Sequence, residues 1–313
     1  VYNPLIHNNE KEFQSFLITQ DLGWEIVQGT WTVDQKLIIN GDLYINAGTK
    51  LLFSEDSYLV VKGALKIYGT EKEPVILEGI DSNWKGIYVL ADDNSDTVIL
   101  NAIFRNTSGV NDGLLSLTGG TNIYKGRVKL DSVDFEGTSA EDALNIIQAE
   151  VDIKNLSVKD SFSDGFDCDY CKGVIIESTF KNIGGDGLDF SGSKVLLERL
   201  SFESIKDKGL SVGEASNVIL KDSVFKTIGV GIASKDGSEA KVFDSSITDY
   251  ELHAAMTYSK KKHFDVYSSL DLANCSVIGD DPFLSQFNTN LTVDGVPQKE
   301  RDVNVEDLYS SGV

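Results

Sequence analysis

A 22-residue repeat runs through the middle of this chain of 313 residues and constrains its fold more than any single motif. Five segments align at that spacing, each with a small residue at the second position and an apolar residue at the third. They begin at Asp142, Asp164, Asp186, Lys208 and Val230. A fixed period of this length indicates coils stacked along an axis, so that residues one period apart become neighbours in space.

The apolar runs of the chain predict short strands. Leu37–Ile39, Leu43–Ile45 and Leu59–Val61 are each soon followed by Gly, Asn or Asp, which are turn residues. Strands this short suit a coil with several strands per turn. Further runs of Val, Ile, Leu and Phe recur downstream of each repeat and predict apolar columns in the interior. The expected class is an all-β solenoid with coils of about 22 residues.

Three regions are predicted. Residues 1–30 read as a linker and an N-terminal cap, because Phe13, Phe16 and Leu17 have helical spacing and an open solenoid end needs a cover. Residues 31–293 form the solenoid, and 294–313 form a closing segment. The start at Val1 carries neither Met nor an apolar signal sequence. We therefore expect either a mature protein or an excised piece of a longer one, and in the full-length protein an additional domain on the N-terminal side.

The charge of the chain restricts its partners. There are 49 acidic and 28 basic residues, which gives a formal net charge of −21. Such a surface repels nucleic acid phosphates, so a nucleic acid partner is not expected. No apolar stretch reaches the roughly 18 residues of a membrane span. An acidic surface does offer the carboxylate oxygens that Ca²⁺ favours.

The cysteines do not predict a disulfide framework. There are three, and Cys168 and Cys171 form a lone Cys-x-x-Cys without a second pair. In the repeat register Cys168 takes the position of Phe190 and Val212, which faces inward. We therefore expect buried apolar cysteines rather than a redox or zinc site.

Several motifs resemble the right-handed parallel β-helix repeat family. They are Leu43-x-Ile45-x-Ala47-Gly48-Thr49, Val61-x-Gly63-x-Leu65, Trp84-Lys85-Gly86-Ile87 and the repeated Asp-Gly-Leu-Asp coils. The resemblance implies a right-handed parallel β-helix over about residues 31–293. It does not fix an activity, because that fold carries polysaccharide lyases, hydrolases, epimerases, phage tailspikes and inert stalks. The segments Ile183–Ser193 and Gly229–Asp236 are also similar to C-terminal β-helix regions of large bacterial surface proteins, some of which carry a spore-coat-kinase-like module upstream.

The first and fourth positions of the repeat stack into acidic columns. We expect Asp164, Asp167, Asp186 and Asp189 to form an oxygen cage for Ca²⁺ if the intervening Gly bends the strand. Lys208, one coil further, is the candidate catalytic base for removing the C5 proton of a uronate, by similarity to the Ca²⁺-dependent β-helix lyases. The alternative is that Asp at a coil corner only caps backbone N–H groups.

A second group lies at the sixth and seventh positions of consecutive coils. Glu214, Lys235, Asp236 and Tyr258 are predicted to form a carbohydrate-binding patch, in which an exposed Tyr stacks on a sugar ring. The alternative is a solvated face with chance ion pairs. The Gly-His-Gly and Asp-Pro-His-Asp patterns of related hydrolases and epimerases are absent, which favours a lyase over a hydrolase and no catalysis over both.

The first functional hypothesis is an extracellular or surface-attached bacterial β-helix module that binds or presents polysaccharide. The alternatives are a Ca²⁺-assisted polysaccharide lyase or related enzyme, and a structural spacer without a ligand.

Overall fold

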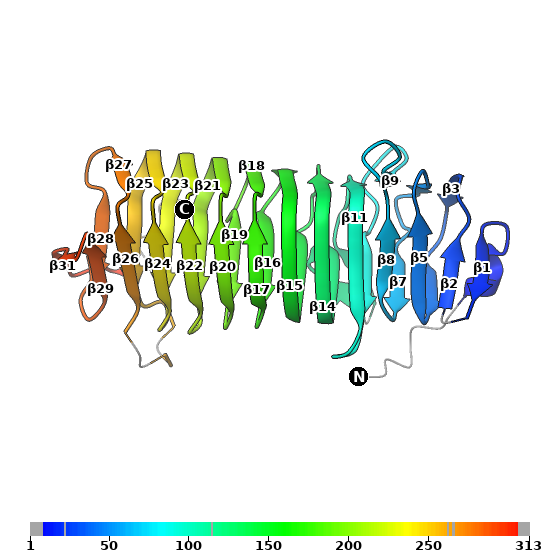
Figure 1. Ribbon diagram of the computed structural model, residues 1–313, viewed down its shortest axis with the longest axis horizontal. Coiled ribbons are helices and arrows are strands. Elements are labelled where there is room, and N and C mark those ends of the chain that lie inside the picture. Colours follow the sequence, from blue (N-terminus) through cyan, green and yellow to red (C-terminus); the bar gives the residue numbers. More distant parts are fainter. Residues whose placement is uncertain (1–8, 22, 114, 262, 265–266, 306–313) are drawn as a thin grey trace. The chain divides into compact units, whose positions relative to one another are not determined.

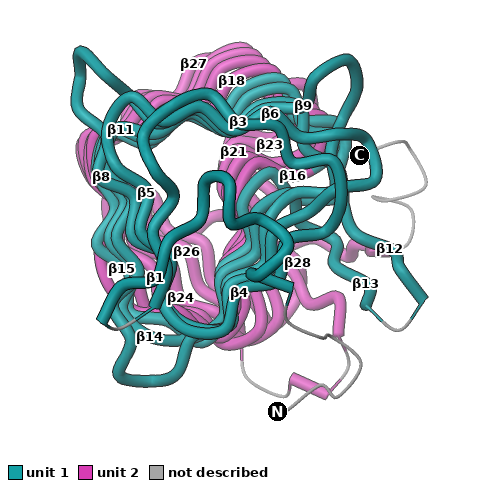
Figure 2. The backbone as a smooth tube through the Cα atoms, turned by 90° about the vertical axis from the view of Figure 1, so that its right-hand side faces the viewer, with its two compact units in different colours: residues 1–163 teal, residues 164–313 magenta. Residues whose placement is uncertain are grey.

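A computed structural model describes residues 9–305 except 22, 114, 262 and 265–266. The chain divides into two compact units, Val1–Ser163 and Asp164–Val313, which Figure 2 draws in teal and magenta. Each unit is built almost wholly of strands, and each folds as a right-handed parallel β-helix, as predicted.

Unit 1 contains one short helix and fifteen strands among its described residues. They are η1 Glu10–Phe13, β1 Leu17–Gln20, β2 Gly23–Ile26, β3 Thr30–Val33, β4 Leu37–Asn40, β5 Asp42–Asn46, β6 Lys50–Phe53, β7 Leu59–Lys62, β8 Leu65–Tyr68, β9 Val75–Gly79, β10 Ile87–Leu90, β11 Asp96–Arg105, β12 Val110–Asp112, β13 Leu115–Leu117, β14 Gly119–Glu136 and β15 Asp142–Ser161.

Three rows of parallel strands form the walls of unit 1. One row is β2, β5, β8, β11, β14 and β15, and parts of it lie side by side in Figure 1. A second is β3, β6, β9 and β11, and a third is β4, β7, β10 and β14. The parallel pairing thus begins at Gly23, a few residues before the boundary predicted at residue 31.

The N-terminal cap differs from the predicted amphipathic helix. Among the described residues of the predicted cap, only Glu10–Phe13 is helical, and the chain then enters β1, which pairs antiparallel with β2. The backbone hydrogen bonds of this hairpin draw Leu17 into a strand, whereas Phe13 and Phe16 are buried as a cap requires. The Phe16 ring stacks on Trp31 with 5.6 Å between the ring centroids.

Unit 2 contains sixteen strands among its described residues. They are β16 Asp164–Asp169, β17 Lys172–Ile176, β18 Thr179–Ile183, β19 Leu188–Ser191, β20 Lys194–Glu198, β21 Ser201–Gly213, β22 Asn217–Lys221, β23 Val224–Lys235, β24 Glu239–Phe243, β25 Ser246–Tyr258, β26 Ser269–Ala273, β27 Ser276–Ile278, β28 Phe283–Gln286, β29 Asn290–Val293, β30 Val296–Pro297 and β31 Glu300–Arg301.

One row of unit 2, called the site row, consists of β16, β19, the ends of β21, β23 and β25, and β28. Its register confirms the 22-residue period, because Phe166 pairs with Leu188 and Leu188 with Leu210. These side chains are fully buried in one inward file. A second row runs through β17, β20, β22, β24 and β26, which lie side by side in Figure 1.

The repeated glycines of the site row make room for a column of aromatic rings. Phe180, Phe202 and Phe225 stack with centroid distances of 5.1 and 4.5 Å. A Cβ atom at Gly187 would lie 2.8 Å from the Phe202 ring and 2.7 Å from the carbonyl oxygen of Gly209. The glycine is therefore explained by close packing between coils and not by a left-handed backbone.

The cysteine expectation needs a correction. Cys168 is buried in register with Phe190, as predicted, but it forms a disulfide with Cys171. The turn after β16 brings the two Cα atoms to 5.9 Å, which is within the range for a disulfide. An inward position in the repeat predicts that a cysteine is buried, but it does not predict a disulfide. The disulfide depends on the turn that brings the two cysteines together.

The C-terminal closing segment begins with β30 and β31. β30 pairs with β29, and β31 pairs with β28. Val303 and Val305 then pack against the outward side of the site row. The part of the predicted closing segment from Glu306 to Val313 lies outside the described residues.

Candidate functional site

Three of the four predicted metal ligands come together on the outward face of the site row. Asp164, Asp186 and Asp189 each place a carboxylate oxygen within 4.8 Å of the other two. Positions one and four of the repeat therefore do converge, as the hypothesis required. Asp167 pairs in register with Asp189 but is not a member of this oxygen group.

The first-position aspartates also hold the backbone of the next coil. Asp164 Oδ1 accepts a hydrogen bond from the Asp186 N–H at 2.8 Å, and Asp186 Oδ1 accepts one from the Lys208 N–H at 2.9 Å. This is the capping role that the alternative reading predicted. Each carboxylate has a second oxygen, so capping and ligand binding do not exclude each other.

Lys208 lies inside an ion-pair network. Its Nζ atom is 3.2 Å from Asp186 Oδ1 and 2.5 Å from Asp207 Oδ2, and its side chain is 5% exposed. Two carboxylates stabilise the charged ammonium form, whereas proton abstraction needs the free amine. The geometry therefore favours Lys208 as a fixed positive charge. Asp207 is a site residue that sequence analysis missed, although it directly precedes Lys208.

Lys235 joins the same network from two coils away. Its Nζ atom lies 3.9 Å from Asp189 Oδ2, and its side chain is 9% exposed. The stem passes over Gly213, where a Cβ atom would lie 2.8 Å from Lys235 Cε. The predicted carbohydrate-binding residue Lys235 thus belongs with the acidic group.

The network carries more negative than positive charge. The carboxylates of Asp164, Asp186, Asp189 and Asp207 outnumber the ammonium groups of Lys208 and Lys235 by two. Burial raises the pKa of Asp189, although the Lys235 charge opposes the shift. Burial and the neighbouring Asp186 likewise raise the pKa of Asp207, against the Lys208 ammonium. In addition, Asp189 Oδ1 is buried without a well-formed hydrogen bond, although the Ser211 hydroxyl lies near enough to this carboxyl to oppose the rise of its pKa.

These properties fit a divalent cation. Two oxygens bound to one Ca²⁺ at about 2.4 Å lie up to about 4.8 Å apart, which matches the spacing of the three carboxylates. A divalent ion also balances two excess charges and satisfies a buried carboxylate oxygen. Asp164, Asp186 and Asp189 are the residues that could hold it.

The remaining residues of the predicted carbohydrate patch have other roles. Burial raises the pKa of Glu214, but its hydrogen bonds with Lys261 and Ser191 outweigh that effect and leave it lowered. Asp236 is fully buried, and its Oδ1 accepts the backbone N–H groups of Lys260 and Lys261 at 2.7 Å each. It therefore acts as a turn cap.

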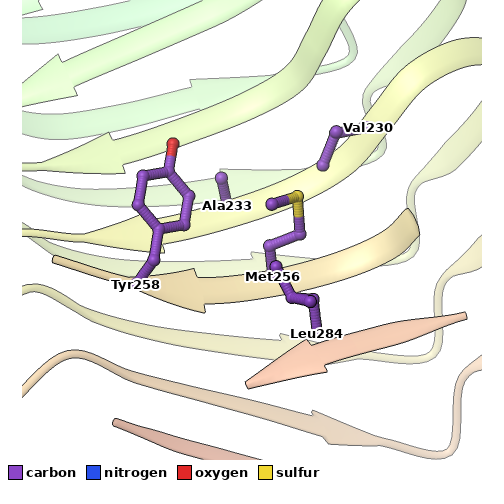
Figure 3. Packing of buried hydrophobic residues seen from close by; sticks show 5 residues of the cluster. All are labelled: Val230, Ala233, Met256, Tyr258 and Leu284. Atoms are coloured by element: carbon purple, nitrogen blue, oxygen red, sulfur yellow. The ribbon is translucent and has the colours of Figure 1, made fainter. Parts of the chain in front are cut away.

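The prediction that Tyr258 is exposed is wrong, because its side chain is buried and only 1% exposed. Figure 3 shows it beside Val230, Ala233, Met256 and Leu284 in an apolar cluster. Val303 and Val305 pack against this cluster. The sequence does contain a signal for this burial. Val230, Ala233 and Met256 are apolar residues at outward positions, and such a column indicates that another segment covers the surface.

The comparisons with known proteins agree with the fold. Residues 120–271 match the family model of the right handed beta helix region. A double mutant of the periplasmic alginate epimerase AlgG is similar with a TM-score of 0.61 at 13% identity, over 90% of this chain and 80% of that one. Unmutated AlgG gives a TM-score of 0.54 at 14% identity with the same coverage.

A carbohydrate-active catalytic domain is also similar. The GH87 α-1,3-glucanase in complex with tetrasaccharides gives a TM-score of 0.52 at 13% identity, over 82% of this chain and 54% of that one. Identities this low show a shared fold. A comparison with curated proteins finds no match. Among the described residues, no helix has the length and apolar character needed to cross a bilayer.

Proposed function

We propose that this chain, whose residues 120–271 carry the repeat of the right-handed β-helix family, binds an acidic polysaccharide on the site row of unit 2. The observation that carries the proposal is the outward group of Asp164, Asp186 and Asp189 with the ammonium groups of Lys208 and Lys235 beside it. A Ca²⁺ ion held by the three carboxylates would link them to a sugar carboxylate, which Ca²⁺ also binds through oxygen. The similar epimerase and glucanase folds support a carbohydrate ligand.

We further propose an extracytoplasmic location. The Cys168–Cys171 disulfide supports it, because such bonds persist in oxidising compartments. The similar alginate epimerase is periplasmic by its own description.

A binding experiment tests the proposed function. Alginate, a uronate polymer, should be retained by the immobilised protein in millimolar Ca²⁺ and released by EDTA. Asp189→Asn should weaken retention at least about tenfold, because it removes one cation ligand charge. Asp280→Asn, in the exposed turn before β28, is the matched control and should retain alginate normally. Equal retention by both variants, or retention unaffected by EDTA, would contradict the cation-bridged site.

A Ca²⁺-assisted lyase is a second candidate. Lys208 Nζ contacts Asp186, and a Ca²⁺ ion bound to this carboxylate would replace one of the two negative charges that stabilise the ammonium, which favours the free amine that proton abstraction needs. If the chain cleaves uronate polymers by β-elimination, an unsaturated product absorbing in the near ultraviolet should accumulate and disappear with EDTA. Lys208→Arg keeps the positive charge but is a very poor base, so it should abolish product formation while leaving alginate retention intact. Retention by the wild-type protein without any such product would leave binding as the function.

A further inference from the structure

A cavity of about 390 Å³ lies in unit 1, apart from the residues discussed above. Its lining includes Lys36, Asp56, Tyr58, Lys85, Val110 and Asp112. Its volume falls within the roughly 300–1,000 Å³ of small-molecule sites. None of these residues lies in a motif that indicates a function.

One wall of the cavity is an insertion between coils. β12 pairs antiparallel with β13, and Figure 2 shows this hairpin standing out from the stacked coils of unit 1. Val110 is 3% exposed and packs against Ile38, Tyr58 and Val60. Because apolar contacts anchor the hairpin to β4 and β7, the Asn111 and Asp112 that line the cavity are held in place.

The polar groups of the cavity are arranged as a donor and acceptor set. Tyr58 is 5% exposed, and its hydroxyl donates to Asp112 Oδ2 at 3.0 Å. Lys36 Nζ contacts the same oxygen at 3.3 Å. Both contacts use Oδ2, so Oδ1 is the oxygen that a ligand hydroxyl would meet. Lys85 Nζ adds a further donor, 4.0 Å from Asp56.

The protonation states of these groups suit hydroxyl recognition. Burial, followed by the hydrogen bond to Asp112, raises the pKa of Tyr58, so the phenol stays a donor at neutral pH. The hydrogen bond from Tyr58 and the Lys36 ammonium lower the pKa of Asp112, so the carboxylate stays an acceptor. Asp34 also lines the cavity, and three carboxylates against two ammonium groups disfavour an anionic ligand.

We propose that this cavity binds one uncharged pyranose unit of a saccharide. The sugar hydroxyls would bond to Asp112, Lys36 and Lys85, and the Tyr58 hydroxyl would hold Asp112 in position from the buried side. The choice of a sugar rests on the proposed function. The cavity itself needs no cation, so unit 1 supplies a Ca²⁺-independent contact for neutral sugar units.

Titration calorimetry with neutral tetrasaccharides of glucose, galactose and mannose tests the proposal. At least one should bind the full chain equally well in Ca²⁺ and in EDTA. Tyr58→Phe keeps the ring and the hairpin packing, and Asp112→Asn keeps the side-chain shape. Both variants should weaken binding about tenfold. Asp112→Asn removes the carboxylate that accepts the ligand hydroxyl, and Tyr58→Phe removes the hydrogen bond that orients this carboxylate. Asp93→Asn, on a carboxylate paired with Lys125 outside the cavity, should bind like the wild type.

Absence of binding by all three probes would overturn the proposal, as would unchanged affinity in both Tyr58→Phe and Asp112→Asn. The experiments distinguish failure of the cavity site from failure of the proposed acidic-sugar site. Alginate retention that responds to EDTA, without any neutral tetrasaccharide binding, would refute the cavity site and leave the proposed function intact. Neutral sugar binding that Asp112→Asn weakens, without alginate retention, would support the cavity site and refute the acidic-sugar function.

Discussion

Phe202→Ala should lower the free energy of unfolding by about 3–5 kcal/mol, the usual cost of removing a buried aromatic ring. Phe202 is fully buried and stacks between Phe180 and Phe225. Its loss opens a cavity between two neighbouring rings and under Gly187, whose packing is built around the Phe202 ring. Urea unfolding followed by circular dichroism measures the change.

Phe162→Ala provides the matched control for this prediction. It makes the same chemical change on a side chain that is 77% exposed, so its effect should stay within about 0.5 kcal/mol. Similar losses for the two variants would show that the ring column does not carry the stability assigned to it.

Lys208→Met should be similarly destabilising at neutral pH, by about 3–5 kcal/mol, although it introduces an apolar side chain at a buried position. The change removes the ammonium that lies between Asp186 and Asp207 and leaves two neighbouring carboxylates without it. Lys181→Met is the control, because Lys181 pairs with Glu203 at 2.8 Å with its side chain 54% exposed. An exposed pair contributes at most about 1 kcal/mol. Equal losses for Lys208→Met and Lys181→Met would contradict the buried network.

The pH dependence of Lys208→Met has a defined sign. The pKa of Asp207 is already raised by burial and by Asp186, and loss of the Lys208 charge raises it further. A carboxyl with a folded-state pKa above its unfolded value binds its proton more tightly when folded, so stability falls as the pH rises through that interval. The deficit of the variant should therefore be largest near pH 7 and shrink toward about pH 4. A deficit that is constant between these values would exclude the carboxylates as its cause.

The proposed site was only partly predictable. Asp164, Asp186 and Asp189 followed from the repeat register, because residues at fixed positions of successive coils become neighbours. The ion pair between Lys235 and Asp189 could not be predicted from the register. It spans two coils, and it requires that Gly213 has no side chain where the Lys235 stem passes. The register predicts a surface position for Tyr258, because it gives the direction of a side chain but not the segments that cover it.

The cavity of unit 1 could not be predicted from the repeat register. The β12–β13 hairpin folds back on Ile38 and Val60, and no spacing or motif in the sequence indicates this contact. That contact is non-local and apolar, and it creates a hollow lined by residues far apart in the chain.

The sequence by itself determined the all-β class, the coil length and the inward file of Phe166, Leu188 and Leu210, because a strict period forces every coil to bury the same positions. Only the tertiary structure decided the Cys168–Cys171 bond, the charge network around Lys208 and the covering of Tyr258. These features depend on turn geometry, long side chains and non-repeating segments, which follow no period and are fixed by packing in three dimensions.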